Sequence, residues 1–315
     1  MKKIILICLI VFPVLTMSQW VQMSNGMGSR SIRALTVGCN NLFAAADSTG
    51  VYLSADNGAS WLQTSLNNDY VYSLAANEDY LIAGTWHGVY LSANNGANWT
   101  KDSLDLKCIC LAIGGDNFFA GSELHGLYIS ANRGSSWTAS PLYFQTVEAL
   151  ALTGDYIFAG ARYYRNSFGL YVSTNNGANW TVTLKNQWVI SLTVSGNLVF
   201  AGTQESGKVY LPGLTYSSMD TGNGVYLSAD MGTSWTQTSL NNRNILTLAA
   251  NGNSVFAGTD TSGLFVSNSS GTSWIQKNEG LGDETINVLS ILGKYIFAGT
   301  KKGVYRRQLS ELIVN

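Results

Sequence analysis

The sequence predicts an all-β fold, a seven-bladed β-propeller with four-stranded blades whose ring is closed by the amino-terminal strand. Three observations predict it. A short turn ending in tryptophan occurs six times, a Gly-apolar-aromatic run occurs seven times, and the two ends of the chain carry complementary parts of one unit. Four short strands per repeat of about 40 residues are typical of propeller blades.

The repeated turn first occurs as SADNGASW at 54–61. Ser54 and Asp56 carry short side chains that can hydrogen-bond the turn backbone, and Gly58 can adopt the positive φ of a tight turn. Trp61 is expected to pack between blades, with an indole N–H that needs a partner. The later copies are SANNGANW (92–99), SANRGSSW (130–137), STNNGANW (173–180), SADMGTSW (228–235) and SNSSGTSW (267–274). They assign the same roles to Asp230 and to the tryptophans Trp99, Trp137, Trp180, Trp235 and Trp274.

Each of the six turns follows a strand that begins with glycine, such as Gly50-Val51-Tyr52 in the first unit, and a seventh such strand, Gly303-Val304-Tyr305, lacks the turn. Upstream of that strand lies another that ends in an FAGT-like run, and before it a strand with a leucine common to all copies. These leucines are Leu35, Leu74, Leu111, Leu150, Leu192, Leu248 and Leu289. Each unit is therefore interpreted as four strands, A to D.

The ring closure is predicted from the two ends of the chain. The seventh unit stops after Tyr305 without its turn and tryptophan, whereas Gln19-Trp20-Val21-Gln22 matches the segment that follows the turn elsewhere, such as Trp61-Leu62-Gln63. The amino-terminal strand is therefore expected to supply strand D of the last blade, which removes an exposed sheet edge.

The first residues predict an export signal. Lys2 and Lys3 precede an apolar stretch from Ile4 to Leu15, and Thr16 and Ser18 place small residues three and one positions before a cut. We expect a signal peptide at 1–18, a propeller domain at 19–315, and a periplasmic or extracellular location. The apolar stretch is too short to span a membrane, and no other stretch is long enough.

Composition argues against several functions. Without Lys2 and Lys3, 16 basic residues remain against 19 acidic ones, so the basic excess of a nucleic-acid binder is absent. Cys108 and Cys110 lie two apart on a strand-like run and are expected to be small core residues. The histidines, His87 and His125, have no nearby cysteine or carboxylate pair, so neither a metal nor another cofactor is expected.

The turn pattern S-x-[DN]-x-G-x-[ST/N]-W resembles the Asp-box, or bacterial neuraminidase repeat, over nearly all of 19–315. This resemblance implies a propeller and places the repeated turns on the face away from the ligand site. The layout is most similar to propeller-type photosystem II assembly factors and other secreted repeat propellers. The sixth copy departs from the pattern because Ser269 occupies the acidic position.

Enzymes also carry this repeat, so we compared the residues with what they need. A sialidase needs three converging arginines, for which Arg30, Arg33 and Arg243 are the candidates, but no Arg-Ile-Pro motif occurs. A glycosidase needs two carboxylates about 5–10 Å apart. Asp69, Glu148 and Glu284 lie at predicted rim positions. A lectin would use Trp86, Trp188 and the tyrosines as sugar platforms.

The candidate site is the face formed by the D–A and B–C connections, here called the D–A/B–C face. Rigid scaffolds commonly position functional residues on such loops. The aligned A strands vary at three positions. Their residues are Arg30, Asp69, Leu106, Gln145, Gln187, Arg243 and Glu284; Ser31, Tyr70, Lys107, Thr146, Trp188, Asn244 and Thr285; and Arg33, Tyr72, Ile109, Glu148, Ile190, Leu246 and Asn287. The B–C loops add Trp86, His87, His125 and the run Arg162-Tyr163-Tyr164-Arg165. Solvated, tolerant surface is the alternative interpretation of all these positions.

The fifth unit carries a 20-residue B–C insertion at 204–223, with Tyr210 and Tyr216, that we interpret as a cover or an extra contact. Our hypothesis is a non-enzymatic binding or assembly module that docks a protein partner on the D–A/B–C face. The alternatives are a carbohydrate-active propeller, either glycosidase or lectin-like, and a structural surface protein. The oligomeric state is left open.

Overall fold

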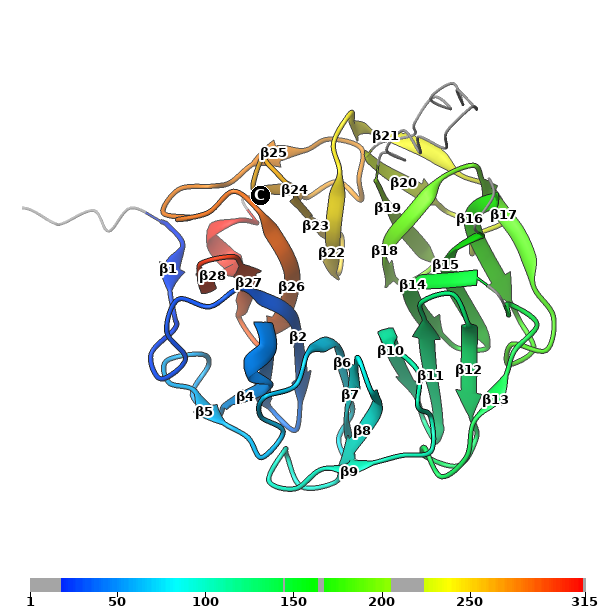
Figure 1. Ribbon diagram of the computed structural model, residues 1–315. Helices are drawn as coiled ribbons and strands as arrows, with labels where there is room; N and C mark the ends of the chain where they lie inside the picture. Colours follow the sequence, from blue (N-terminus) through cyan, green and yellow to red (C-terminus); the bar gives the residue numbers. More distant parts are fainter. Residues whose placement is uncertain (1–17, 144, 164–166, 205–223, 314–315) are drawn as a thin grey trace, which may run out of the picture.

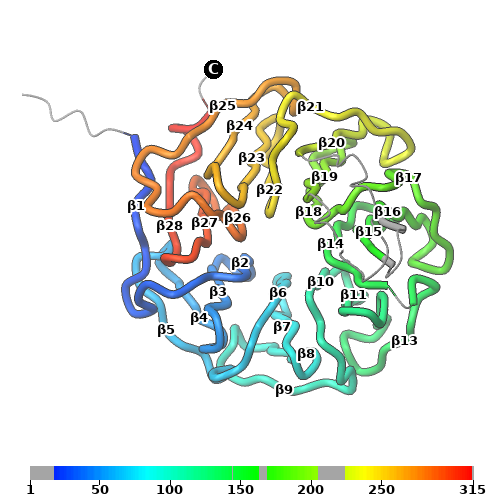
Figure 2. The backbone as a smooth tube through the Cα atoms, turned by 45° about the horizontal axis from the view of Figure 1, so that its top comes forward, coloured from blue at the N-terminus to red at the C-terminus, as the bar shows by residue number. Residues whose placement is uncertain are grey.

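The computed structural model describes residues 18–143, 145–163, 167–204 and 224–313. In these residues seven antiparallel sheets of four strands each surround a common centre (Figure 1). The innermost strands contact one another in sequence around the ring, and the last also contacts the first. Figure 2 shows the same closed ring from a second direction. The predicted seven-bladed propeller is confirmed.

The first three blades follow one another directly along the chain. Blade 1 consists of β2 (Ile32–Gly38), β3 (Asn41–Ala46), β4 (Val51–Ser54) and β5 (Leu62–Gln63), with the short helix η1 (Asp47–Thr49) between β3 and β4. Blade 2 consists of β6 (Val71–Ala76), β7 (Leu81–Thr85), β8 (Gly88–Ser92) and β9 (Thr100–Lys101). Blade 3 consists of β10 (Cys108–Gly114), β11 (Asn117–Ser122), β12 (Gly126–Ser130) and β13 (Thr138–Ala139).

The remaining blades complete the ring. Blade 4 consists of β14 (Gln145–Thr153), β15 (Tyr156–Tyr163), β16 (Ser167–Ser173) and β17 (Thr181–Lys185). Blade 5 consists of β18 (Trp188–Ser195), β19 (Leu198–Gln204), β20 (Gly224–Ser228) and β21 (Thr236–Asn241). Blade 6 consists of β22 (Ile245–Asn251), β23 (Ser254–Thr259), β24 (Leu264–Ser267) and β25 (Ile275–Gln276). Blade 7 consists of β26 (Ile286–Leu292), β27 (Tyr295–Thr300), β28 (Gly303–Gln308) and β1 (Val21–Gln22), and the short helix η2 (Leu309–Glu311) follows β28.

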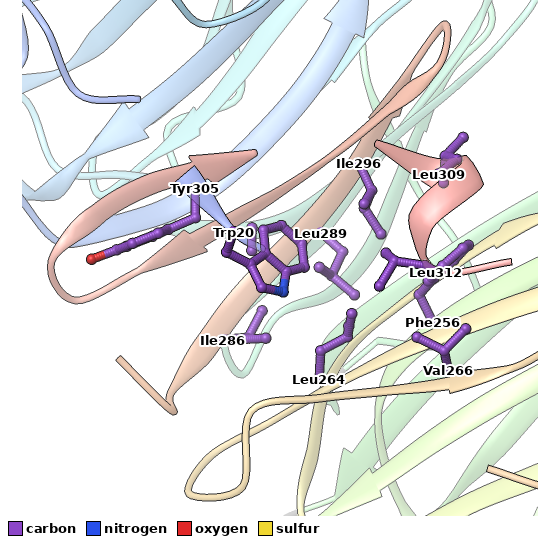
Figure 3. Close-up of a cluster of buried hydrophobic side chains, with 11 residues drawn as sticks. Trp20, Phe256, Leu264, Val266, Ile286, Leu289, Ile296, Tyr305, Leu309 and Leu312 are labelled. Carbon is purple, nitrogen blue, oxygen red and sulfur yellow. The ribbon is translucent and has the colours of Figure 1, made fainter. Parts of the chain in front are cut away.

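The amino-terminal strand closes the ring, as predicted. In β1, Val21 pairs with Arg306 and Gln22 pairs with Tyr305, so β1 is the outer strand of blade 7. The preceding residue, Trp20, is only 2% exposed and belongs to the core between blades 6 and 7 (Figure 3). Its indole N–H donates to the carbonyl of Lys277 at 2.9 Å. A short strand is thus anchored by one large buried side chain.

The core lies between blades. Phe297 of β27 packs with Ile32 and Trp61 of blade 1, and Phe256 of β23 packs with Ile286 of blade 7. Cys108 and Cys110 are buried core residues, which confirms their predicted role. Burial raises the pKa of the Cys108 thiol to about 12 and that of Cys110 well above its usual value.

The repeated turns connect strands C and D and have one hydrogen-bond pattern. In the first copy the Ser54 hydroxyl accepts from Gly58 N at 2.8 Å and donates to Asp56 Oδ1 at 2.8 Å, and Asp56 Oδ1 also accepts from Ser60 N. Gly58 has φ +83°, as predicted, but Asn57 before it also has a positive φ of +57°. In the sixth copy the hydroxyl of Ser269 replaces the carboxylate as acceptor.

The turn tryptophans all pack against clusters between adjacent blades, but the partners of their indole N–H groups differ. Trp61 is fully buried, and its indole N–H donates to Met23 O beside β1, across the blade boundary. The indole N–H of Trp137 likewise donates to Asp102 Oδ2, which follows the last strand of the preceding blade. The indole groups of Trp180 and Trp274 instead donate to glycine carbonyls within their own turns, and that of Trp99 is buried without a partner. Inter-blade hydrogen bonding by the indole is therefore not general.

Acid is expected to weaken the turns that contain a carboxylate. Hydrogen bonds from Ser234 lower the pKa of Asp230 to about 2, and those from Ser60 lower the pKa of Asp56. A folded-state pKa below the unfolded value contributes stability above the unfolded pKa of about 4, and that stability is lost as the pH falls toward the folded pKa. We therefore expect stability to fall between about pH 4 and pH 2 through these two groups.

The measurement is urea unfolding at several pH values for the wild type and for the double variant Asp56→Asn, Asp230→Asn. Asparagine is a matched replacement because Asn94 and Asn175 already accept the same backbone N–H in turns of the same kind. The stability difference between the two proteins should be largest near neutral pH and shrink below about pH 4. A difference that does not change with pH would contradict this assignment.

Candidate functional site

A β-bulge occurs at the start of every A strand. In each of the seven A–B strand pairs the register shifts by one residue near the D–A/B–C face. A bulge leaves one residue out of the ladder and turns its side chain in a new direction. The bulged residues are Arg33, Tyr72, Ile109, Glu148, Ile190, Leu246 and Asn287. These are the residues of the third variable position, so the bulge explains why that position is free to differ.

Cations and aromatic rings alternate across blades 1 to 3. Arg33 lies over the ring of Tyr70, with 5.2 Å from Cζ to the centroid, and 6.0 Å from that of Tyr72. The Lys107 ammonium lies 4.8 Å from the Tyr72 centroid and 4.6 Å from that of Trp86. The rings of Tyr72 and Trp86 are 6.5 Å apart. We call these five residues the cation–aromatic ladder.

Acidic side chains fix the two cations of the ladder. Lys107 Nζ lies 2.6 Å from Glu123 Oε2, and Arg33 Nε lies 3.6 Å from Asp47 Oδ1. Both acids come from B–C connections, whereas both cations come from the ends of A strands. The two loop sets of this face therefore hold each other in place, and the charges of the ladder are balanced pair by pair.

The exposed end of the ladder is a two-residue turn. Trp86 and His87 connect β7 to β8, and the Thr85 hydroxyl closes the turn by accepting from His87 N and donating to Gly88 O. Trp86 is 55% exposed although its ring is large and apolar. The His87 imidazole lies 3.6 Å from Asp69. A rigid turn thus presents an aromatic surface to solvent.

A second group joins blades 4 and 5. Glu148, the bulged residue of β14, accepts from Arg162 Nε at 2.7 Å and from the indole N–H of Trp188. The Arg162 guanidinium lies 4.9 Å from the Trp188 ring centroid. We call these three residues the Glu148 group. Both oxygens of Glu148 have partners, which differs from the pair of substrate-facing carboxyl groups that glycoside hydrolysis needs.

Blades 6 and 7 contribute amides and hydroxyls to the same face. Asn244 donates to Asp260 Oδ2 at 2.7 Å, and Thr285 donates to the Asp260 carbonyl at 2.8 Å. The bulged Asn287 donates to Ile32 O of blade 1 at 3.0 Å. None of these residues is aromatic, whereas blade 2 contributes Tyr70, Tyr72 and Trp86 and blade 5 contributes Trp188.

The structure brings together some of the predicted site residues and separates others. Arg33, Asp69, Tyr70, Trp86 and His87 gather on blades 1 and 2, and Arg162 and Trp188 meet in the Glu148 group. The others lie apart: Arg30 bonds Met27 O in its own loop, His125 contacts the Glu123 carbonyl, and Arg243 and Glu284 are exposed. Tyr164, Arg165, Tyr210 and Tyr216 lie outside the described residues, as does the side chain of Tyr163.

Tyr72 and Lys107 were predicted only as members of variable positions, Glu148 was predicted also as a candidate glycosidase carboxylate, and Asp47 was not predicted as a partner. The signal that was present is the mixture of aromatic and charged residues at equivalent positions of adjacent blades. Within 18–143, 145–163, 167–204 and 224–313 there is no cluster of three or more His, Cys, Asp or Glu suited to a metal. No helix in that part of the chain is long and apolar enough to cross a membrane.

No protein-family model matches this sequence, and no curated protein matches it either. Solved structures do share its fold. The extracellular domain of a putative one-component system from B. thetaiotaomicron has a TM-score of 0.71 at 20% identity, covering 92% of this chain and 40% of that one. YCF48 bound to a D1 peptide has a TM-score of 0.66 at 13% identity, covering 93% and 96%. The GH74 xyloglucanase from Xanthomonas campestris has a TM-score of 0.70 at 14% identity, covering 93% and 54%. At such identities the similarity concerns the fold.

Proposed function

We propose that this chain is an exported, non-enzymatic propeller of the Asp-box class that docks a protein partner on its D–A/B–C face. The observation that carries the proposal is the cation–aromatic ladder. Tyrosine, tryptophan and arginine dominate the residues on which protein interfaces depend, because they combine a large apolar surface with directed polar contacts. In the ladder these residue types are held in position and partly exposed, with Tyr70 at 41% and Trp86 at 55%.

The same geometry favours a polypeptide over a sugar. Tyr72 has two cations near its ring, and Trp86 has Lys107 near its ring, so part of the aromatic surface is already in contact with protein side chains. Because each ladder cation is paired with a carboxylate, binding is not expected to require a strongly charged ligand. A partner segment with apolar and polar side chains would match this surface best.

A carbohydrate ligand is the second candidate, and the exposed ring of Trp86 is the observation that favours it. The fold hosts both kinds of function, since one structural neighbour is bound to a peptide and another is a xyloglucanase. A fold by itself does not decide between them. The pairing of Glu148 with Arg162 and Trp188 argues against a glycosidase at the Glu148 group.

The test is photocrosslinking in the native cell envelope. A benzophenone-bearing phenylalanine replaces Tyr70 in the ladder and, in a second protein, replaces Ala97 in the repeated turn of the same blade. We expect one polypeptide to be crosslinked from position 70 and not from position 97, and to be lost when Tyr72→Ala is added. Equal capture from both positions, or capture that survives Tyr72→Ala, would reject docking on this face. A glycan array run on the same protein tests the second candidate.

A further inference from the structure

The two ends of the described chain meet at Arg307, whose side chain is only 3% exposed. Its Nη1 donates to Glu279 Oε2 at 2.8 Å. Its Nη2 donates to Ser18 O at 3.0 Å and to Ser18 Oγ at 2.8 Å. A buried guanidinium needs partners for its donors, because leaving a buried charge unpaired is costly. Ser18 therefore occupies one edge of a buried arginine.

Two carboxylates share this single guanidinium. Glu311 Oε2 accepts from Ser18 Oγ at 3.0 Å and lies 3.4 Å from Arg307 Nε, which has no hydrogen-bond partner. Glu279 has its pKa lowered, mainly by its hydrogen bond from Arg307 and, to a smaller extent, by the charge of Lys277. Glu311 is thus held close to the guanidinium without accepting a hydrogen bond from Nε. Two carboxylates face one guanidinium here, so a further positive charge would be stabilised.

The residues at this site coincide with the predicted cut. Thr16 and Ser18 stand three and one positions before the bond that joins Ser18 to Gln19. We propose that this bond is hydrolysed before the ring closes, and that Arg307, Glu279 and Glu311 form the docking site of the new amino terminus at Gln19. The proposal rests on the export part of the proposed function and not on what the D–A/B–C face binds.

The reaction is the hydrolysis of one peptide bond by a signal endopeptidase. Water adds across the C–N bond, Ser18 leaves with a new carboxylate, and Gln19 keeps the nitrogen as an α-ammonium group. In the closed ring the Ser18 carbonyl is held by Arg307, and Trp20 two residues later is buried. Ser18 and Gln19 are themselves exposed, but a protease that binds residues on both sides of the bond in an extended form needs Ser18 and Trp20 released from these contacts. Because the ring closes on β28 and Arg307, which follow the other six blades along the chain, we expect the cut to precede closure during synthesis and export.

Removal of Ser18 changes the contacts of Arg307 in a defined way. Arg307 Nη2 loses its two acceptors, Ser18 O and Ser18 Oγ, and Glu311 Oε2 loses the Ser18 hydroxyl as a donor. Nε and Nη2 of Arg307 lie on the same edge of the guanidinium. Glu311 can then accept from both nitrogens, which is the strong bidentate arrangement of arginine and carboxylate. Trp20 N donates to the Glu279 carbonyl at 2.7 Å, so the nitrogen of Gln19, one residue earlier, is expected to lie near Glu279 once it becomes an α-ammonium group. Processing therefore strengthens the closure.

The first experiment is mass-spectrometric mapping of the amino terminus of the protein recovered from the cell envelope or medium, where a chain that begins at Gln19, cyclised or not, is expected. Any other first residue overturns the proposal. The second compares urea unfolding of a chain released from a removable fusion at position 19 with one that retains Ser18 behind a neutral acetyl group. Both carry Gln19→Ser, which prevents cyclisation of the amino-terminal glutamine. We expect the folding equilibrium constant to be roughly tenfold higher for the processed chain.

A matched variant shows whether the gain depends on the proposed site. Glu311→Gln should remove most of the difference between the two chains, whereas Glu284→Gln on an exposed connection should leave it unchanged. If the processed chain is no more stable, or if its advantage survives Glu311→Gln, the docking site is wrong. Neither outcome depends on partner binding, so this inference and the proposed function can fail separately.

Discussion

Trp20→Ala is expected to destabilise the ring by about 3–5 kcal/mol, the usual cost of truncating a large buried aromatic side chain. Trp20 is 2% exposed, contacts core residues of blades 6 and 7, and donates its indole N–H to Lys277 O. The strand it anchors, β1, pairs through only Val21 and Gln22. Loss of the side chain therefore removes most of what holds the last blade closed. Urea unfolding at neutral pH measures the effect.

Val21→Ala is the matched control because it lies on the same strand and is 50% exposed. Its free energy of unfolding should stay within about 0.5 kcal/mol of the wild type, as expected for a surface substitution. If Trp20→Ala and Val21→Ala have similar effects, β1 does not close the ring by burying Trp20. Freed β1 would also expose the edge of β28, so Trp20→Ala is expected to be the more prone of the two to self-associate.

The second large effect is on partner affinity. Trp86→Ala and Tyr72→Ala are each expected to weaken binding of the crosslinked partner by about 10- to 100-fold, which is the range for a central interface residue. Tyr72 contacts both cations of the ladder, so its loss also removes one ring contact from each of Arg33 and Lys107. Isothermal titration calorimetry or biolayer interferometry on purified components gives the dissociation constants.

Lys107→Met separates charge from packing in the same experiment. It keeps a long apolar side chain beside Tyr72 and Trp86 but removes the ammonium and leaves Glu123 without its partner. The control is Ile275→Ala, which changes a residue that is 61% exposed on the outer strand β25. Ile275→Ala should bind like the wild type. If it weakens binding as much as Trp86→Ala does, the ladder is not the contact surface.

The fold was predictable because its determinants repeat locally. All residues that form a turn such as SADNGASW lie within eight positions of one another, and this pattern occurs six times. The closure by β1 was also predictable, since Trp20-Val21-Gln22 carries the pattern that is missing after Tyr305. Not every local detail could be predicted from the sequence. Asn57, Met231 and their equivalents adopt a positive φ before the glycine, and only the fixed hydrogen bonds of the turn reveal why.

The candidate site was predictable as a face but not as a set of contacts. Lys107 belongs to blade 3 and Trp86 to blade 2, and their proximity follows from the angle between blades and from the bulge that redirects Tyr72. Neither the angle between blades nor the direction of a bulged side chain can be inferred from the residue spacing within one repeat. The partners of Glu148 depend in the same way on a bulge in β14 and on the first residue of β18. Arg30 and Arg33, three apart, have unrelated partners because one precedes β2 and the other is its bulged residue.

Hydrogen exchange of the protein with and without its bound partner shows directly which face the partner covers. We expect slower exchange in segments 69–72, 85–88 and 105–109 on the D–A/B–C face, while the repeated turns at 54–61 and 92–99 exchange at the same rate in both states. The turns are an internal control because they belong to the same blades. Protection concentrated in the repeated turns, with none around Tyr72 and Trp86, would rule out docking on the D–A/B–C face.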